Sequence, residues 1–278
     1  MGLFKLIRFE LPFSAGVCVI MGQLLALGKF APVKEMSLGF LSVFFISASI
    51  LVLNDYFDIE TDRINAPDRP LPTNAVTKTE ALLLSIILLL GGLVFSLLLN
   101  ILAFIGTAIL LTIGFLYNRK FKKSGLPGNL MVSFSVGMTF IYGAVAVGLP
   151  LNRRAWFFGV IAALIDLGEE IAADAMDIKG DTLIDSNSLA IRYGKAAALK
   201  TSNSIFYLVI LLTAFPFLLN WFRTIYIVPI AVIDISITYG AYKLLKSGND
   251  SGRKYIRLIY LGATLGLLVF IMMRLIGI

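Results

Sequence analysis

The sequence predicts an all-α, polytopic membrane protein whose helices surround a central cavity. Of its 278 residues, 58% are hydrophobic and only 15% are charged, and the mean hydropathy is +0.89. A membrane-spanning helix needs roughly 20 apolar residues, so the chain has room for about nine spans joined by short loops. We therefore expect residues 1–278 to form a single transmembrane domain.

Apolar runs separated by short polar stretches give the positions of the predicted spans. The first run follows a short segment of mixed charge without a small-x-small cleavage site, so we interpret it as a retained span, with a removed signal peptide as the alternative. Asn100 separates the third span from the fourth, and without this break the two would merge. The predicted spans are 12–28, 37–57, 79–98, 100–117, 127–148, 154–177, 203–220, 224–245 and 255–274.

The distribution of Lys and Arg predicts the orientation of these spans. With the N-terminus in the cytoplasm, the cytoplasmic segments hold 18 of the 24 basic residues and the opposite side holds six. Because cytoplasmic loops carry the excess of Lys and Arg, this count favours about nine spans in the cell membrane with the N-terminus inside and the C-terminus outside. The polar clusters described next then all lie on the cytoplasmic side.

One acidic cluster lies at the end of the second predicted span. Residues 54–68 contain five of the 17 acidic residues in the chain. Asn54, Asp58 and Asp62 are spaced i, i+4, i+8, so on a helix they would lie along one face. Oxygen-bearing side chains in this arrangement suit a hard divalent cation such as Mg²⁺. For any single acid here, the alternative is a capping residue in a solvated loop.

A second acidic cluster lies at the end of the sixth predicted span, where residues 166–185 contain seven acids. Glu170, Asp174, Asp177 and Asp181 are spaced 4, 3 and 4 residues apart, which places them on one stripe of a helix that Gly180 is a candidate to end. Like charges on one face repel each other, so a positive partner is required. We expect the two clusters to face each other, to hold metal ions and to bind a polyanion through those ions.

A third polar stretch, residues 117–129, is basic and lies on the same predicted side as the acids. It contains Arg119, Lys120, Lys122 and Lys123. These residues are either a plain cytoplasmic anchor or ligands for the oxygens of a diphosphate that the metals hold from the other side. GxxxxGK[ST] and GxGxxG are both missing, so ordinary nucleotide-binding loops are not supported, and the high apolar content argues against a nucleic-acid partner.

The amino-acid composition excludes several other kinds of site. The chain has no histidine, and its single cysteine, Cys18, lies in an apolar run. Histidine-ligated zinc or haem, a histidine general base and a disulfide framework are therefore excluded. Both acidic clusters offer a metal ion oxygen ligands alone.

The acidic motifs resemble those of the UbiA superfamily of intramembrane prenyltransferases, in which nine spans is also the usual number. The first cluster is similar to the family's NDxxDxxxD motif and is followed by an RPLP-like turn at residues 69–72. The second is similar to the family's later Asp-rich motif, and residues 117–129 resemble its basic loop between the fourth and fifth spans. Within the superfamily, the chain is most similar to the archaeal branch that includes digeranylgeranylglyceryl phosphate synthase. The matching acidic-motif residues are Asn54, Asp55, Asp58, Asp62, Asp174, Asp177 and Asp181.

This resemblance implies a Mg²⁺-dependent reaction inside the membrane. The allylic C–O bond of a prenyl diphosphate, such as geranylgeranyl diphosphate, ionises, and a lipid acceptor such as geranylgeranylglyceryl phosphate attacks the cation. The implied metal ligands are Asn54, Asp58, Asp62, Asp174, Asp177 and Asp181, and of these Asp58, Asp62, Asp177 and Asp181 are expected to be essential for catalysis. The residues implied to bind substrate are Arg8, Arg69, Tyr117, Arg119, Lys120 and Lys123. Phe134, Phe140 and Tyr142 are candidates to contact the prenyl tail, with ordinary helix packing as the alternative.

Departures from that branch leave the acceptor open. Ala173 precedes Asp174 where the branch usually has Lys, Thr73-Asn74 stands in place of Ser-Gly, and Phe9 rather than Pro follows Arg8. The alternative acceptor is an aromatic precursor of a quinone.

Two rival functions fit the sequence less well, and no obligate protein partner is inferred. A cation transporter would favour acids near the middle of spans, and only Asp234 lies well inside one. An enzyme that transfers a phosphatidyl group would require a denser DG-containing acidic motif than this chain has.

Overall fold

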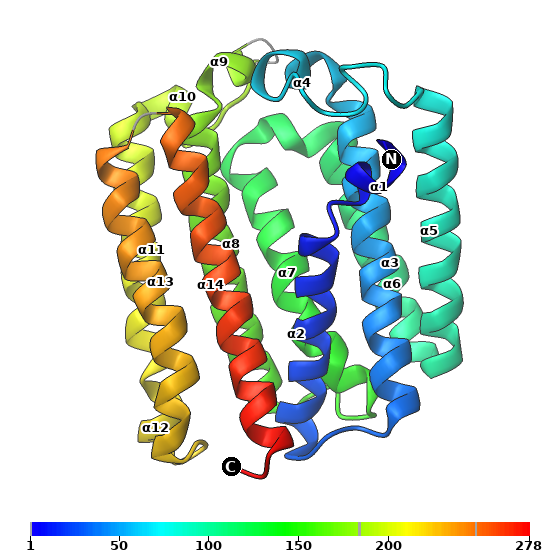
Figure 1. Ribbon diagram of the computed structural model, residues 1–278, viewed down its shortest axis with the longest axis vertical. Helices are drawn as coiled ribbons and strands as arrows, with labels where there is room; N and C mark the ends of the chain where they lie inside the picture. Colours follow the sequence, from blue (N-terminus) through cyan, green and yellow to red (C-terminus); the bar gives the residue numbers. More distant parts are fainter. Residues whose placement is uncertain (1, 183–184, 248) are drawn as a thin grey trace.

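The computed structural model describes residues 2–182, 185–247 and 249–278, which form a bundle of long helices (Figure 1). These residues form helices and the turns between them, with no strand among them, so the all-α prediction is confirmed. The long helices are α2 (Glu10–Leu27), α3 (Val33–Phe57), α5 (Lys78–Leu99), α6 (Ile101–Leu116), α7 (Leu126–Ala146), α8 (Arg153–Met176), α11 (Lys195–Thr213), α13 (Ile227–Lys246) and α14 (Asn249–Leu275).

Eight segments of the described chain are long and apolar enough to cross a membrane, which makes this a multi-pass membrane protein. Helix α8 is not one of the eight, although its 24 residues equal or exceed the length of most of them. It carries Asp166, Glu169, Glu170 and Asp174, which reduce its hydropathy. Nine spans, with α8 as the ninth, therefore stays a prediction.

Most predicted spans coincide with observed helices to within a few residues, and Asn100 separates two helices as expected. Its backbone is extended, and its side-chain oxygen accepts a hydrogen bond from the Ala103 amide at 2.8 Å, which caps α6. The span predicted at 203–220 is wrong at its start, because α11 already begins at Lys195. Gly194 precedes it with φ 85°, a conformation that favours glycine.

The stretch predicted as a basic loop is also helical. After α6 the chain continues as a π-helical turn, η1 (Tyr117–Phe121), and then as a 3₁₀ turn, η2 (Lys122–Ser124). Helix α7 follows from Leu126. π-helical turns such as η1 are frequent at functional sites.

The two acidic clusters lie at the end of the bundle that holds the N-terminus (Figure 1). Short helices cap this end, namely α1 (Gly2–Ile7), α4 (Ile59–Asn65), α9 (Ile178–Asp181) and α10 (Leu189–Tyr193). The C-terminus lies at the opposite end, which agrees with the predicted odd number of crossings.

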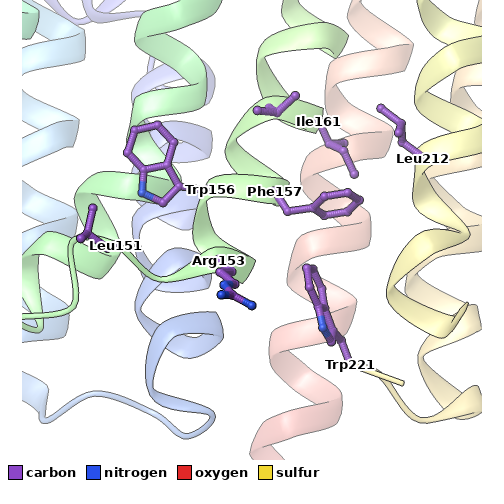
Figure 2. A pocket seen from close by; sticks show the side chains of 8 residues that line it. Leu151, Arg153, Trp156, Phe157, Ile161, Leu212 and Trp221 are labelled. Atoms are coloured by element: carbon purple, nitrogen blue, oxygen red, sulfur yellow. The ribbon is translucent and has the colours of Figure 1, made fainter. Parts of the chain in front are cut away.

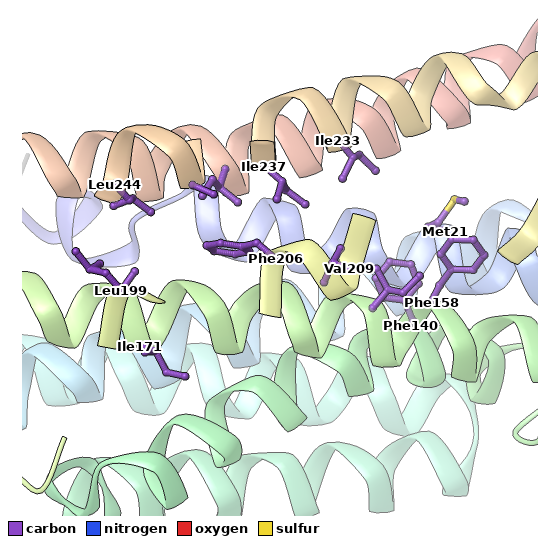
Figure 3. Close-up of a cluster of buried hydrophobic side chains, with 14 of the residues drawn as sticks. Met21, Phe140, Phe158, Ile171, Leu199, Phe206, Val209, Ile233, Ile237 and Leu244 are labelled. Carbon is purple, nitrogen blue, oxygen red and sulfur yellow. The ribbon is translucent and has the colours of Figure 1, made fainter. Parts of the chain in front are cut away.

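The largest buried cluster packs α8 against α11 and α13 (Figure 3). Phe206 of α11 is fully buried, and its ring lies so close to Gly168 that a β-carbon there would come within 2.6 Å of it. The Ser202 hydroxyl also donates to the Gly168 carbonyl at 2.6 Å. These contacts fix the face of α8 opposite to the one that carries the site.

Candidate active site

Helices α3 and α8 end in the same way, each at an aspartate. Asp58 lies between α3 and α4 with φ −95° and ψ 5°, and Asp177 lies between α8 and α9 with φ −102° and ψ 10°. This bridge region of backbone space is sparsely populated and common in active sites. Gly180 lies inside α9, so the expectation that it ends the helix is wrong. The break falls at Asp177, and the Asp181 amide still donates to the Asp177 carbonyl at 3.0 Å.

The structure brings the two acidic clusters together. Helix α4, which follows Asp58, packs against α9, which follows Asp177. Both pairs of acids, Asp58 with Asp62 and Asp177 with Asp181, therefore lie at this contact. The expectation that the clusters meet holds for the described chain.

The two helical turns that follow α6, η1 and η2, each make one side-chain contact with the first cluster. The Asn54 amide donates to the Asn118 side-chain oxygen at 2.9 Å, and Lys122 donates to the Asp58 carboxylate. Asn118 was not expected as a site residue, and Lys122 was one of four basic candidates in its stretch but was not among the residues predicted to bind substrate. Asn54 and Asp58 are four residues apart, and so are Asn118 and Lys122. This shared spacing in two segments was the feature of the sequence that could have predicted the two contacts.

Arg8 and Arg69, both predicted to bind substrate, pair with acids of the same cluster. Arg8 pairs with Asp55, which is almost fully buried, while Arg69 donates to Asp62 at 2.6 Å and to Asp55 at 3.3 Å. Burial alone would lower the pKa of Arg69, but Asp55 and Asp62 raise it above its ordinary value. Arg8 has φ 49°, a left-handed conformation that costs a non-glycine residue about 1–2 kcal/mol. Strain of this kind is typical of functional sites.

The second cluster contains one ion pair and one unbalanced acid. Arg253 of α14 pairs with Asp177, and the Asn129 amide donates to Asp174 at 2.9 Å. Burial, followed by the charges of Asp174 and Asp177, raises the pKa of Asp181 to about 7. Negative charge therefore exceeds positive charge around Asp181.

Other predicted site residues lie less centrally. Arg119, Lys120 and Lys123 are exposed, and no carboxylate of the described residues lies within ion-pairing distance of them. Tyr117 is half-buried in the π-helical turn. These four residues remain predicted contacts of a substrate.

A cavity of about 600 Å³ runs from the acidic end into the bundle. Arg8, Glu169 and Glu170 line it, and most of the remaining wall is apolar. Phe140 and Tyr142 also line it, so both remain candidates to contact a prenyl tail. Phe134 instead is 49% exposed and is not one of the lining residues, because it lies on the outward face of α7.

A second pocket, of about 510 Å³, lies along the first part of α8, at the opposite end of this helix from the acids (Figure 2). Trp156, Phe157 and Trp221 line it together with Arg153. Tryptophan and arginine at a helix end are typical of the membrane–water interface. This pocket therefore contributes nothing to the candidate active site.

The acidic residues suit a metal ion whose coordination shell is completed by the substrate. No three acids of the described residues lie close enough together to bind an ion by themselves. Mg²⁺ usually takes one or two carboxylates and completes its shell with water and substrate phosphates. The oxygen-only ligands and the excess negative charge at Asp181 agree with such a site.

Comparison with known proteins gives the family. The pattern of the UbiA prenyltransferase family matches residues 15–273. Digeranylgeranylglyceryl phosphate synthase of Methanocaldococcus jannaschii is 35% identical over 96% of this chain and 94% of its own length. The chain belongs to the UbiA prenyltransferase family. It is accordingly a membrane-embedded prenyltransferase.

Solved structures of UbiA proteins have the same fold. A UbiA homologue from Aeropyrum pernix K1, in its apo form, superposes with a TM-score of 0.85 at 19% identity, covering 96% of this chain and 99% of that one. A UbiA homologue from Archaeoglobus fulgidus, bound to GPP and Mg²⁺, gives a TM-score of 0.69 at 19% identity, covering 97% and 99%. At these identities the similarity establishes the UbiA fold.

Proposed function

We propose that this protein transfers a prenyl group from a polyprenyl diphosphate, such as geranylgeranyl diphosphate, to a lipid acceptor in a Mg²⁺-dependent reaction. One observation carries the proposal. The acidic helix ends of α3 and α8 pair with Arg8, Arg69, Lys122 and Arg253, and a largely apolar cavity lined by Arg8, Glu170 and Ala173 extends from this end of the bundle. The charged end suits a diphosphate and the apolar cavity suits a hydrocarbon tail, so a prenyl diphosphate matches both.

The basic residues, the acidic residues and the apolar cavity each have a distinct role in this reaction. Arg and Lys side chains that now pair with the acids are free to bind diphosphate oxygens once a divalent cation takes their place on the carboxylates. The ligands proposed for Mg²⁺ are Asn54, Asp58, Asp62, Asp174, Asp177 and Asp181. When bound, Mg²⁺ supplies positive charge that stabilises the leaving diphosphate. The apolar cavity holds the prenyl tail and keeps water away from the allylic carbon.

Geranylgeranylglyceryl phosphate is the proposed acceptor, because the similar protein of Methanocaldococcus jannaschii is named digeranylgeranylglyceryl phosphate synthase. Ala173 supports a second candidate, an aromatic acceptor. It lines the cavity next to Asp174 and leaves a small apolar wall there, which would accommodate a ring.

The orientation of the site completes the proposal. The excess of Lys and Arg at the end that holds α4 and α9 supports a cytoplasmic position for the active site. Prenyl diphosphates are charged at one end, and this orientation would let the diphosphate enter from the cytoplasm while the tail lies among the helices.

The experiment uses purified protein in lipid nanodiscs with geranylgeranyl diphosphate, Mg²⁺ and one acceptor at a time. We expect acceptor-dependent release of diphosphate and a prenylated product detectable by mass spectrometry, with neither in EDTA. Full turnover in EDTA, or no product with either class of acceptor, would contradict the proposal. Cation flux into vesicles without any prenyl product would favour a transporter instead.

A further inference from the structure

One acid in the cavity has no part in the diphosphate site described above. Glu169 lies on the face of α8 that lines the cavity, in a stripe formed with Ala162, Ile165, Asp166 and Ala173. Asp174 is five positions after Glu169, which corresponds to about 7.5 Å along the helix axis. Glu169 therefore lies deeper in the bundle than the acids at the mouth of the cavity.

The Glu169 carboxylate lacks a partner that its neighbours have. Ser133 donates to Asp166 at 3.0 Å, and Asn129 donates to Asp174 at 2.9 Å. The Oε1 atom of Glu169 is buried and has no hydrogen-bond partner among the described residues. An unsatisfied buried polar group costs about 1–3 kcal/mol, more when it is charged. An ionisable residue inside a membrane bundle is by default a candidate functional group.

The position of Glu169 matches one requirement of the reaction. If the diphosphate lies among the acids at the cavity mouth, the allylic carbon lies on its inner side, toward the apolar wall. The acceptor oxygen has to approach that carbon from within the cavity. A carboxylate on the inner wall, with a free lone pair, is within the region where this oxygen would lie.

We propose that Glu169 is the general base that removes the proton of the acceptor hydroxyl, an inference that rests on the proposed function. The allylic C–O bond of the donor breaks, and its electron pair leaves with the diphosphate. The acceptor oxygen forms the new C–O bond to the allylic carbon. Its proton passes to a carboxylate oxygen of Glu169, so charge and atoms balance.

Other groups in the cavity are less suited to this task. Asp166 already accepts a bond from Ser133. Glu170 lies on the stripe that continues to Asp174 and Asp177, and so belongs with the diphosphate site. The titratable side chains that line the cavity besides Glu169 are Arg8, Cys18, Tyr142, Asp166, Glu170 and Tyr260.

The test compares Glu169→Gln with Glu169→Asp and with Asp234→Asn in nanodiscs. Asp234 is a matched control, since it is also an acid inside the bundle but bonds to Thr213 at 3.0 Å and does not line the cavity. General bases typically contribute 10²–10⁴-fold to a rate. We expect Glu169→Gln to lower kcat by about 100-fold or more and to abolish the fall in kcat at acidic pH. Binding of a thiolodiphosphate analogue of the donor should be unchanged, and Asp234→Asn should keep the normal rate.

Each outcome bears on the inference separately from the proposed function. A Glu169→Gln enzyme with normal kcat and the normal fall in kcat at acidic pH (the acidic limb of the pH profile) would overturn the role of Glu169. Loss of the acidic limb in Glu170→Gln but not in Glu169→Gln would assign the base to Glu170 and equally overturn it. Should Glu169→Gln fail to bind the analogue, Glu169→Asp decides. It should bind the donor normally, keep the acidic limb and turn over about 10-fold more slowly, because its carboxylate is set back by one methylene, and an unchanged kcat would refute the proposal. Absence of prenyl transfer by the unaltered protein would instead contradict the proposed function.

Discussion

Lys122 donates a hydrogen bond to the carboxylate of Asp58 and so joins the helical turns after α6 to the break after α3. One turn deeper, Asn118 and Asn54 form the parallel contact between the same two segments. Both side chains of the ion pair are largely shielded, with exposed fractions of 31% for Lys122 and 9% for Asp58. A metal ion bound to Asp58 would displace Lys122, which is then positioned to bind the donor diphosphate.

Lys122→Met should therefore weaken donor binding. A hydrogen bond to a charged group contributes about 1.5–3 kcal/mol. Its loss should raise the KM for the prenyl diphosphate by about 10-fold to 100-fold, with a smaller change in kcat. Steady-state kinetics with varied donor and saturating acceptor measure both values.

Lys123→Met is the comparison for this prediction. Lys123 is the next residue in the chain, is exposed and has no carboxylate within ion-pairing distance among the described residues. As a predicted substrate contact that no acid holds in place, it should contribute less than Lys122, and its replacement should raise KM by less than about fivefold, since exposed charges commonly contribute less than 1 kcal/mol. An equal loss in both variants would show that the general basic charge, rather than the Lys122 contact, binds the donor.

The difference between Lys122 and Lys123 shows which features of the site the sequence could predict. The long apolar runs predicted the helices well because hydropathy over 20 residues decides membrane insertion. The position of each basic side chain was harder to predict. In the π-helical turn from Tyr117 to Phe121, each residue turns by less than in an α-helix, so ordinary periodicity misplaces the side chains that follow.

The acidic residues of the site were easier to predict than its partners. Asp58 and Asp177 were found from their spacing, because four-residue intervals survive the breaks in both helices. Arg253 was missed because it is 76 residues away from Asp177 in the chain, and only the packing of α14 beside α8 brings them together. Contacts of this range depend on tertiary structure, which local patterns do not contain.

Asp58→Asn and Asp177→Asn should each lower turnover sharply. Each change removes one negative charge without altering the size of the side chain, and loss of one charge-stabilising group costs about 10²–10³ in rate. Thermal stability in detergent should change little, because the relief of repulsion among neighbouring acids offsets the loss of the ion pair with Lys122 or Arg253. A kcat measurement and a melting curve on the same preparations provide the test.

Asp185→Asn is the control for these two variants. Asp185 is an exposed acid just beyond the second cluster, and no hydrogen bond of its side chain is part of the site. It should keep the normal rate. A fully active and stable Asp177→Asn protein would remove the second cluster from the proposed reaction.

The orientation in the membrane is testable with single cysteines in a Cys18→Ser background. Asp185 lies at the acidic end of the bundle, while Leu151 lies in the turn between α7 and α8 at the other end and is 83% exposed. Asp185→Cys should react with an impermeant maleimide only from the cytoplasmic side, and Leu151→Cys only from the opposite side. The reverse pattern would place the active site outside.

Mg²⁺ and the donor diphosphate should stabilise the protein cooperatively, because the acids alone do not form a complete metal site. No three acids among the described residues converge on one point, so the ion needs phosphate oxygens for a full coordination shell. Melting temperatures measured with Mg²⁺, with a thiolodiphosphate analogue and with both should show a shift for the pair that exceeds the sum of the separate shifts. A full shift with Mg²⁺ alone would contradict a shared site.

The same shift should depend on pH through Asp181. Burial and the charges of Asp174 and Asp177 raise its pKa from 3.8 to about 7 in the folded protein. A raised carboxyl pKa stabilises the metal-free fold below about pH 4 and loses that contribution as the pH rises through 7. Bound Mg²⁺ offsets the repulsion among the ionised acids, so the shift given by Mg²⁺ with the analogue should be larger at pH 8 than at pH 6. Asp181→Asn should reduce this difference, and a shift that is equal at both pH values in the unaltered protein would exclude Asp181 from the metal site.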